Sequence, residues 1–219
     1  MSPDQRTGYF GHPRREMEPF VPAGAGSVLD VGCGAGAFAA TLRAARPGRQ
    51  LEIWGVELMP EAAVLARGNL DQVLVGDAVV RVAELPEARF DCVVLNDVLE
   101  HLAEPAPLLH QVRRVLRPGG SLVASLPNVR YFFNVWDLAV HGRWDYVDEG
   151  ILDRTHLRFY TRSSLRRLLE SEGFAVEMMQ GINPTGSLKF GLVNLLTFGR
   201  CADMRWLQFA CVATPRTMP

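Results

Sequence analysis

Short apolar runs alternate with stretches of helical periodicity between Ser27 and Leu126. Continuous apolar runs bounded by glycine, proline or acidic residues predict buried strands, and apolar positions three and four residues apart predict helices. The strands are expected at 27–31, 51–56, 72–75, 90–95 and 121–126, and the helices at 37–45, 60 to about 68, and 105–116. Because parallel strands need crossover connections, this order predicts a doubly wound parallel sheet.

The rhythm changes after Pro127. Thr161 is a suitable N-cap for a helix over 162–172, which Gly173 would end. Two further strands are expected at 174–179 and 206–213, with an amphipathic helix at 188–196 between them. The sequence shows no repeat and no long linker. We therefore expect one domain over 27–219, an N-terminal segment 1–26 that could act as a lid, and an acceptor-site insertion at about 127–160.

Composition narrows the class of partner. The 219 residues are 48% hydrophobic and 21% charged, which is typical of a globular chain, and the formal net charge of −1 gives no general attraction for nucleic acid. The apolar stretch Leu188–Phe198 is too short to span a bilayer. The polar start resembles no signal peptide, and the four cysteines form no CxxC pair. We expect a cytoplasmic monomer or homodimer with reduced thiols and a small-molecule partner.

The first expected strand runs into a glycine-rich turn, Asp30-Val-Gly-Cys-Gly-Ala-Gly36. Glycines let the backbone approach a ligand closely, and the helix N-terminus that follows favours hydrogen-bond acceptors. Residues Gly34–Ala39 also fit the dinucleotide pattern G-x-G-x-x-A, so a nicotinamide or flavin enzyme has to be considered. The Asp30 carboxylate could hold loop N–H groups or a ligand ammonium, and it would repel a pyrophosphate.

Acidic residues also follow the next two strands. Glu57 could accept both hydroxyls of a ribose, and Asp77 could accept from an exocyclic amine such as that of adenine. Either acid alone is more simply a helix cap or a solvated turn residue. Acids at three successive strand ends favour a ligand site, because open α/β sheets bind ligands beyond the carboxyl ends of their strands.

Five motifs in order resemble those of class I S-adenosylmethionine-dependent methyltransferases, over roughly Tyr9 to Phe174. They are Val28-Leu-Asp-Val-Gly-Cys-Gly-Ala-Gly36, Gly55-Val-Glu57, Gly76-Asp-Ala78, Phe90-Asp-Cys-Val-Val-Leu-Asn-Asp-Val-Leu-Glu-His101 and Leu116-Arg-Pro-Gly-Gly120. The resemblance implies a single Rossmann-like, mostly parallel seven-stranded α/β sheet with a final antiparallel strand. The form of the fourth motif is similar to that of small-molecule and sugar methyltransferases.

The resemblance also implies the cofactor S-adenosylmethionine and a set of residues that bind it. The methionine part would lie against Asp30, Gly32, Cys33, Gly34 and Gly36. The remaining cofactor-binding residues would be Glu57 and Leu58 at the ribose, Asp77 and Ala78 at the adenine, and Asn96 and Asp97 beside the cofactor.

Two histidines are candidates for catalysis. Methyl transfer to an alcohol needs alignment of the acceptor and removal of its proton. His101 follows the fourth strand, and His156 lies just before the helix over 162–172. Each could be a general base or position the acceptor, and each could instead only fix its loop. No HxxxH pattern or carboxylate cluster predicts a metal site.

The segment 127–160 is dense in aromatic residues with arginines between them, and could form an aromatic helical cover over the sheet. Its aromatics could simply be core, or it could be a lid over the acceptor, in which Arg130, Tyr131, Trp144 and Arg154 bind substrate. The same composition also suits single-stranded nucleic acid, which the near-neutral charge disfavours. Tyr9-Phe10 and Arg14-Arg15 could close over the cofactor.

The sequence therefore predicts a methyltransferase acting on a small molecule, with a sugar or natural-product hydroxyl as the leading acceptor. An NAD(P)-dependent oxidoreductase is the first alternative. Asp30, Asp77 and the lack of a Tyr-x-x-x-Lys pair oppose it. A non-catalytic protein that binds S-adenosylmethionine is the second alternative.

Overall fold

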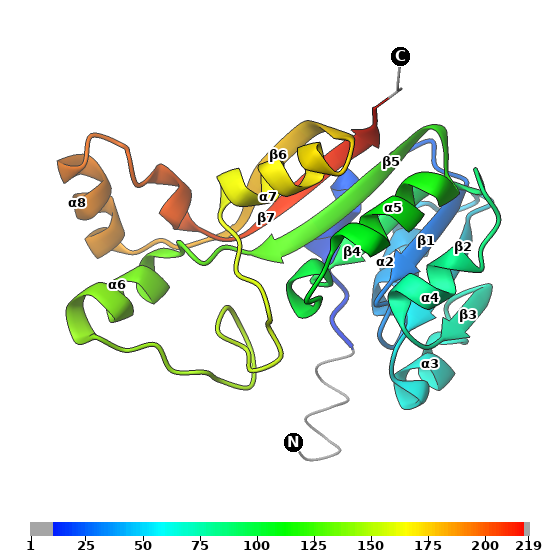
Figure 1. Ribbon diagram of the computed structural model, residues 1–219, viewed down its shortest axis with the longest axis horizontal. Coiled ribbons are helices and arrows are strands. Elements are labelled where there is room, and N and C mark those ends of the chain that lie inside the picture. The colour runs from blue at the N-terminus through cyan, green and yellow to red at the C-terminus, as the bar shows by residue number, and fades with distance from the viewer. Residues whose placement is uncertain (1–10, 217–219) are drawn as a thin grey trace.

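The computed structural model describes residues 11–216, and its centre is a seven-stranded sheet in the order β3-β2-β1-β4-β5-β7-β6 (Figure 1). The strands are β1 (Ser27–Val31), β2 (Glu52–Glu57), β3 (Gln72–Val75), β4 (Phe90–Asn96), β5 (Leu116–Pro127), β6 (Phe174–Pro184) and β7 (Trp206–Pro215). Neighbours from β3 to β5 pair in parallel, whereas β7 runs antiparallel to both β5 and β6. The predicted sheet with its final antiparallel strand is confirmed.

Helices cover both faces of the sheet. The α-helices are α2 (Ala37–Ala45), α3 (Pro60–Ala66), α4 (Ala78–Ala83), α5 (Ala106–Val115), α6 (Phe132–His141), α7 (Arg162–Ser171) and α8 (Leu188–Leu196), and the 3-10 helices are η1 (Arg15–Phe20), η2 (Leu99–His101) and η3 (Ala202–Arg205). Buried side chains of α4, α5 and α7 join one core cluster with the sheet, and those of η1, α2 and α3 join the other. No helix in residues 11–216 is long and apolar enough to cross a membrane.

Helix α4 has no counterpart in the sequence prediction. Its first residues include Val79 and Val80, and β-branched side chains lower helix propensity. The Asp77 side chain accepts hydrogen bonds from the N–H groups of both valines, so a local cap starts the helix. The sequence alone does not show whether Asp77 caps a helix or belongs to a solvated turn; the structure shows that it is the N-cap of α4.

The predicted aromatic cover is helical only in α6; the rest of residues 127–160, all of which the structure describes, is irregular. Phe132 of α6 packs against Phe190 of α8 and with Met204, and α6 and α8 extend together from one end of the molecule (Figure 1). Residues 142–160 then lead back to the sheet, where the N–H of Val129 donates to the carbonyl of Tyr160.

The predicted N-cap of α7 gives a stability test. Thr161 Oγ1 accepts from the N–H of Ser164, and Ser164 Oγ accepts from the N–H of Thr161, which is a capping box. Thr161→Ala should lower the free energy of unfolding by about 1 kcal/mol, because it leaves a helix N–H without its partner. Thr161→Ser keeps the oxygen and is the matched control. Urea denaturation measures both; equal loss in the two variants would contradict the capping role.

Candidate functional site at the carboxyl edge of the sheet

Three positions of the turn after β1 have a backbone conformation that favours glycine. Gly32, Gly34 and Gly36 have φ angles of 73°, 53° and 79°, in the left-handed region that other residues rarely adopt. A Cβ on Gly32 would lie 2.9 Å from Val98 Cγ2. The N–H groups of Gly32 and Cys33 both donate to the carbonyl of Val56, so the turn is bound to β2. The result is a rigid loop at the start of α2.

Two buried carboxylates lie beside this loop. Glu57 Oε2 accepts from the N–H of Gly34, and Oε1 accepts from the N–H of Met59, each at 2.8 Å. Asp30 is only 2% exposed and its Oδ2 has no hydrogen-bond partner. Burial, with the Glu57 charge, raises the pKa of the Asp30 carboxyl to about 7. An unpaired acid in this cradle is suited to a cationic group of a ligand.

Asp77 and its neighbours lie beyond β3. Asp77 Oδ1 caps α4, accepting from the N–H groups of Val79 and Val80 at 2.9 and 3.1 Å, so it performs the helix-cap role considered from the sequence. A carboxylate has lone pairs beyond these two bonds, so the cap leaves acceptor capacity for a ligand amine. Leu58, at the end of β2, is 64% exposed and offers apolar surface next to Glu57.

Asp97 joins the N-terminal segment to the end of β4. Its Oδ2 forms an ion pair with Arg14 Nη1 at 2.6 Å, and its Oδ1 accepts from Gln208 Nε2 at 2.9 Å. Arg14 Nη2 also donates to Ser125 Oγ at 2.6 Å. Burial raises the pKa of Asp97, against the lowering effect of the Arg14 charge. The adjoining Asn96 has a buried Nδ2 without a partner.

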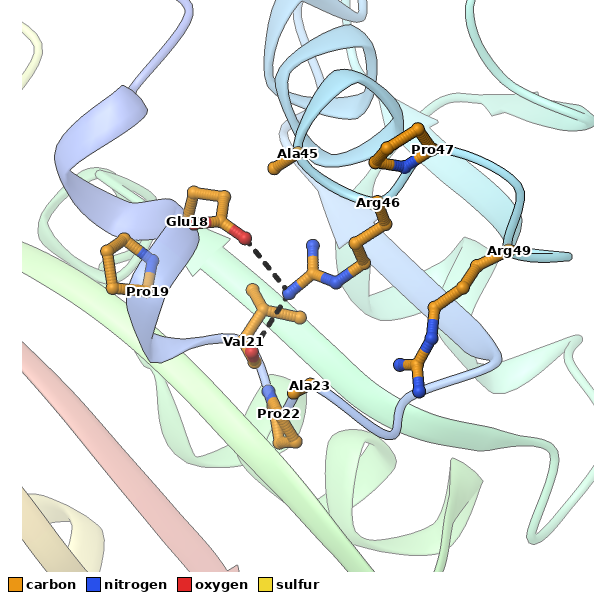
Figure 2. A pocket seen from close by; sticks show the side chains of 9 residues that line it. All are labelled: Glu18, Pro19, Val21, Pro22, Ala23, Ala45, Arg46, Pro47 and Arg49. Atoms are coloured by element: carbon orange, nitrogen blue, oxygen red, sulfur yellow. Dashed lines mark hydrogen bonds and ion pairs between the residues drawn. The ribbon is translucent and has the colours of Figure 1, made fainter.

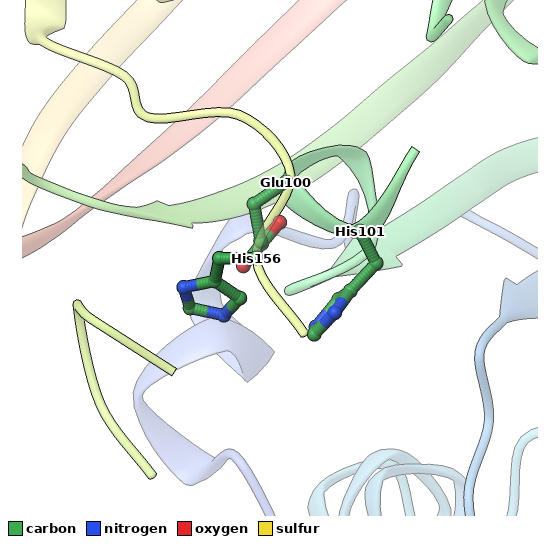
Figure 3. A group of neighbouring side chains, drawn as sticks. All are labelled: Glu100, His101 and His156. Atoms are coloured by element: carbon green, nitrogen blue, oxygen red, sulfur yellow. The ribbon is translucent and has the colours of Figure 1, made fainter. Parts of the chain in front are cut away.

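The structure brings the two candidate histidines together with Glu100 (Figure 3). The ring centroids of His101 and His156 are 4.8 Å apart at 70°, and a ligand atom from each of the three side chains lies within 4.8 Å of the others. Glu100 is 1% exposed, with neither carboxylate oxygen hydrogen-bonded. Burial, and then the charge of His156, lower the pKa of His101.

Backbone hydrogen bonds assemble this cluster. The carbonyl of Glu100 accepts from the N–H groups of Leu157 at 2.8 Å and Arg158 at 3.0 Å, which places His156 beside η2. The sequence reasoning missed Glu100 as a site residue. Its signal was an acid within the apolar run Val98-Leu-Glu-His-Leu102, where an unpaired charge would be costly.

The predicted acceptor-binding residues fall in two groups. Arg130 pairs with Asp203 at 3.3 Å, and Tyr131 stands at the N-cap of α6 with its ring 5.8 Å from that of Phe133. Trp144 packs edge-on against Phe159 and belongs, with Arg154, to the segment that carries His156. The Arg154 side chain is exposed and pairs with Asp148. Tyr9 and Phe10 lie outside the described residues.

An open hollow of about 520 Å³ lies at the other end of α2 from the glycine loop (Figure 2). Arg46 extends across it and donates to the carbonyl of Val21 at 3.0 Å, with Glu18 at 3.2 Å. It contains none of the acids or histidines of the carboxyl edge, so the residues that could perform chemistry are not in this hollow.

Several known proteins similar to this chain are methyltransferases. A family model described as a methyltransferase domain matches residues 6–178. A ubiquinone biosynthesis O-methyltransferase of Azorhizobium caulinodans is 30% identical over 182 residues, 80% of this chain and 67% of that protein. A 37.1 kDa protein in a Streptomyces fradiae transposon is 35% identical over 161 residues, 68% of this chain and 44% of that protein. This chain thus spans about half the length of several curated relatives.

A solved structure of a SAM-dependent methyltransferase from Archaeoglobus fulgidus superimposes with a TM-score of 0.69 at 20% identity, covering 95% of this chain and 93% of the other. The putative methyltransferase of Haloferax volcanii, solved with the Trm112 activator, gives a TM-score of 0.63 at 20% identity over 98% of this chain and 95% of the other. These likenesses show the same fold.

The raised pKa of Asp30 predicts how stability changes with pH. Its folded-state value of about 7 exceeds the unfolded value, so ionisation of this group destabilises the fold progressively as pH rises from about 4 to 7. Asp30→Asn removes that cost, and its stability relative to the parent should grow over this range by up to about 1.4 kcal/mol per pH unit. Urea denaturation at several pH values measures the difference.

Asp91→Asn is the control of opposite sign. Although burial raises the pKa of Asp91, hydrogen bonds from Arg117 and from Gly26 and Ser27 hold the value below its usual range. That variant should lose stability relative to the parent as pH rises towards about 4, and the difference should then stay constant up to pH 7, where the parent already has its full Asp91 contribution. If the stability of the parent and of Asp30→Asn changes equally with pH, the pKa of Asp30 is not raised in the folded protein.

Proposed function

The chain belongs to the S-adenosylmethionine-dependent methyltransferase family, and we propose that it transfers a methyl group from this cofactor to the hydroxyl oxygen of a small molecule. A sugar or another natural product is the leading acceptor. The observation that carries the proposal is the meeting, at one edge of the sheet, of a glycine loop, unpaired acids and two histidines. The Azorhizobium relative is an O-methyltransferase, which supports oxygen as the methylated atom.

The residues around the glycine loop suit the methionine end of the cofactor. Asp30 Oδ2 is a buried acceptor without a partner, and a ligand ammonium would supply one. The backbone of Gly32, Cys33, Gly34 and Gly36 can approach the ligand closely, because three of these residues have no Cβ. These residues are proposed to bind the amino acid part of S-adenosylmethionine.

The acids on the neighbouring strands suit the adenosine end. Each oxygen of Glu57 accepts one backbone N–H, so lone pairs remain for the two ribose hydroxyls, with Leu58 beside them. Asp77 and Ala78 are proposed at the adenine, and Asn96 and Asp97 beside the cofactor. The unpartnered Asn96 Nδ2 is a donor that a bound ligand could satisfy.

When bound, S-adenosylmethionine supplies a methyl carbon activated by a sulfonium, with a neutral thioether as leaving group. The chain has to align the acceptor hydroxyl with that carbon and take up its proton. We propose His101 and His156 for this task. His101 lies just after β4 in the chain, and His156 packs against it. A neutral imidazole can accept a proton near pH 7.

The acceptor is proposed to enter over the segment 127–160, which carries Arg130, Tyr131, Trp144 and Arg154. Aromatic rings suit sugar faces or planar acceptors, and arginines suit carboxylate or phosphate groups. His156 lies near the carboxyl end of this segment, so an acceptor bound along the segment would be close to the proposed catalytic pair.

The N-terminal segment is proposed as a cover for the cofactor. Arg14 already reaches the edge of the sheet through Asp97 and Ser125, and Thr41 Oγ1 donates to the carbonyl of Pro13 at 2.8 Å. We also propose that the methyltransferase domain begins after residue 26, that the protein is cytoplasmic, and that it is a monomer or a homodimer. An NAD(P)-dependent oxidoreductase is disfavoured, because Asp30 would repel a pyrophosphate in the glycine turn.

Cofactor binding provides the first functional test. Glu57→Gln should weaken binding of S-adenosylmethionine and of S-adenosylhomocysteine by about 1–3 kcal/mol, because hydrogen bonds to a charged acceptor are lost. Isothermal titration calorimetry measures both affinities. Glu61→Gln changes an exposed acid on α3 and is the matched control. Unchanged affinity in Glu57→Gln, or tight NAD binding by the parent, would refute the assignment.

Turnover provides the second test. We expect His101→Ala or His156→Ala, or both, to lose about 10²–10⁴-fold in turnover with S-adenosylmethionine affinity within a few-fold of the parent. Transfer of labelled methyl to a panel of sugar and natural-product hydroxyls measures this. His110→Ala, an exposed histidine on α5, is the control. Near-parent turnover in both variants would mean that neither histidine activates the acceptor.

A further inference from the structure

Glu100 presents an electrostatic problem that the described residues leave unsolved. Its side chain is 1% exposed, and neither carboxylate oxygen has a hydrogen-bond partner. Buried carboxylates are ordinarily paired or hydrogen-bonded, because an isolated charge in a low-dielectric interior is costly. Residues 11–216 therefore supply no group that donates hydrogen bonds to these two oxygens or coordinates them.

The surrounding charges are mostly negative. Asp97 and Asp153 face Glu100 and both raise the pKa of its carboxyl further above the value that burial sets, while the Arg14 guanidinium opposes them. Asp153 is itself buried and accepts from the N–H and hydroxyl of Thr155. Within residues 11–216, these three carboxyl groups thus share one nearby arginine, Arg14, which is already paired with Asp97 at 2.6 Å.

The hydrogen bonds of His156 define its free nitrogen. Its Nδ1 lies 2.9 Å from the carbonyl oxygen of Ile151. A carbonyl can only accept, so Nδ1 carries the hydrogen and Nε2 of the neutral ring keeps an unshared lone pair. Metal-binding histidines in proteins are oriented by this kind of bond from the nitrogen that does not touch the metal.

His101 is held in the same way. Its Nδ1 lies 3.1 Å from Thr155 Oγ1 and 3.3 Å from the Thr155 carbonyl oxygen. The Thr155 hydroxyl donates to Asp153 Oδ1 at 2.6 Å, so its oxygen is free to accept from His101. A carboxylate therefore acts through a threonine to orient this ring, and the lone pair of Nε2 is again left unshared.

We propose that Glu100, His101 and His156 form a binding site for a divalent transition-metal ion of the zinc class. One carboxylate and two imidazoles are the protein ligands of many catalytic zinc sites, and such three-ligand sites leave a position open for water or substrate. Figure 3 shows the Glu100 carboxylate and the two imidazole rings grouped together. The order of these residues along the chain gives no metal-binding motif, because His156 comes from another segment.

Binding the ion requires a small contraction of the cluster. The ligand atoms lie within 4.8 Å of one another, whereas ligands about 2.0–2.1 Å from a tetrahedral zinc are about 3.3 Å apart. Side-chain rotations that move each ligand atom by about 1 Å would close this gap.

The catalytic role of the ion rests on the proposed function, whereas the binding of the ion does not. An ion at this place would offer its open position to the acceptor oxygen and lower the pKa of the bound hydroxyl, whose proton then leaves to solvent. His101 and His156 would activate the acceptor as ligands of the ion rather than as free bases.

The test uses the whole chain, stripped with a chelator and dialysed. Zinc binding is measured by calorimetry and by metal analysis after gel filtration, and Co²⁺ is added separately for its visible absorption spectrum. We expect about one ion per chain and d–d bands typical of nitrogen and oxygen ligands. Zn²⁺ should raise the melting temperature of the parent. Glu100→Gln, which preserves shape, and His156→Asn should each weaken binding at least tenfold, whereas His110→Ala and His141→Ala should not.

Absence of binding, or equal binding by the parent and Glu100→Gln when both are folded, would overturn the inference. So would an intense sulfur-to-cobalt charge-transfer band, which would assign the ion to a cysteine. Methyl transfer that persists unchanged in chelated enzyme would overturn the catalytic role while leaving the proposed function intact. Stoichiometric binding lost in Glu100→Gln would support the site even if every acceptor tested failed.

Discussion

The parallel pairing of β1 with β2 and β4 is the constraint on which the candidate site depends. Parallel strands all end at the same edge of a sheet, so the residues that follow them meet although they are far apart in sequence. Asp30 pairs with both Gly55 and Val94 in this register, which places it between the ends of its two neighbours. The glycine turn is held at this edge because the N–H groups of Gly32 and Cys33 donate to the carbonyl of Val56.

One consequence of this convergence is an excess of buried negative charge. Asp30, Glu57 and Glu100 are all buried at this edge, with Asp97 beside them; Asp30 keeps one oxygen without a hydrogen-bond partner and Glu100 keeps two. Burial raises the pKa of both carboxyl groups, so keeping either of them ionised in the fold costs stability. Sites of this kind favour cationic ligands, because binding supplies the partners that folding left out. A cationic cofactor at Asp30 and a metal ion at Glu100 would relieve the same problem at two neighbouring points.

Two segments outside the sheet reach this edge by different means. The N-terminal segment is held by one ion pair, between Arg14 and Asp97, and by the bond from Arg14 to Ser125. The segment around His156 is held by two backbone N–H groups that donate to the carbonyl of Glu100. Helices α6 and α8 contribute their own small core around Phe132 and Phe190, apart from the two clusters that cover the sheet. Segment 127–160 is thus anchored both at the sheet and at this separate helical core.

Local sequence was sufficient for most of the strands and helices, α4 excepted, and for the prediction that certain residues lie at the carboxyl edge. The bounds expected for β1, α2, β3 and α8 agree with the structure, because apolar periodicity and glycine or proline boundaries are local properties. Residues that follow a strand directly, such as Glu57 and Asp97, could be predicted at the carboxyl edge for the same reason. The cluster of Glu100, His101 and His156 could not, since His156 reaches η2 through contacts across more than fifty residues. Whether a buried acid has a partner is likewise decided only by tertiary packing, because burial and hydrogen bonding depend on neighbours that are distant in sequence.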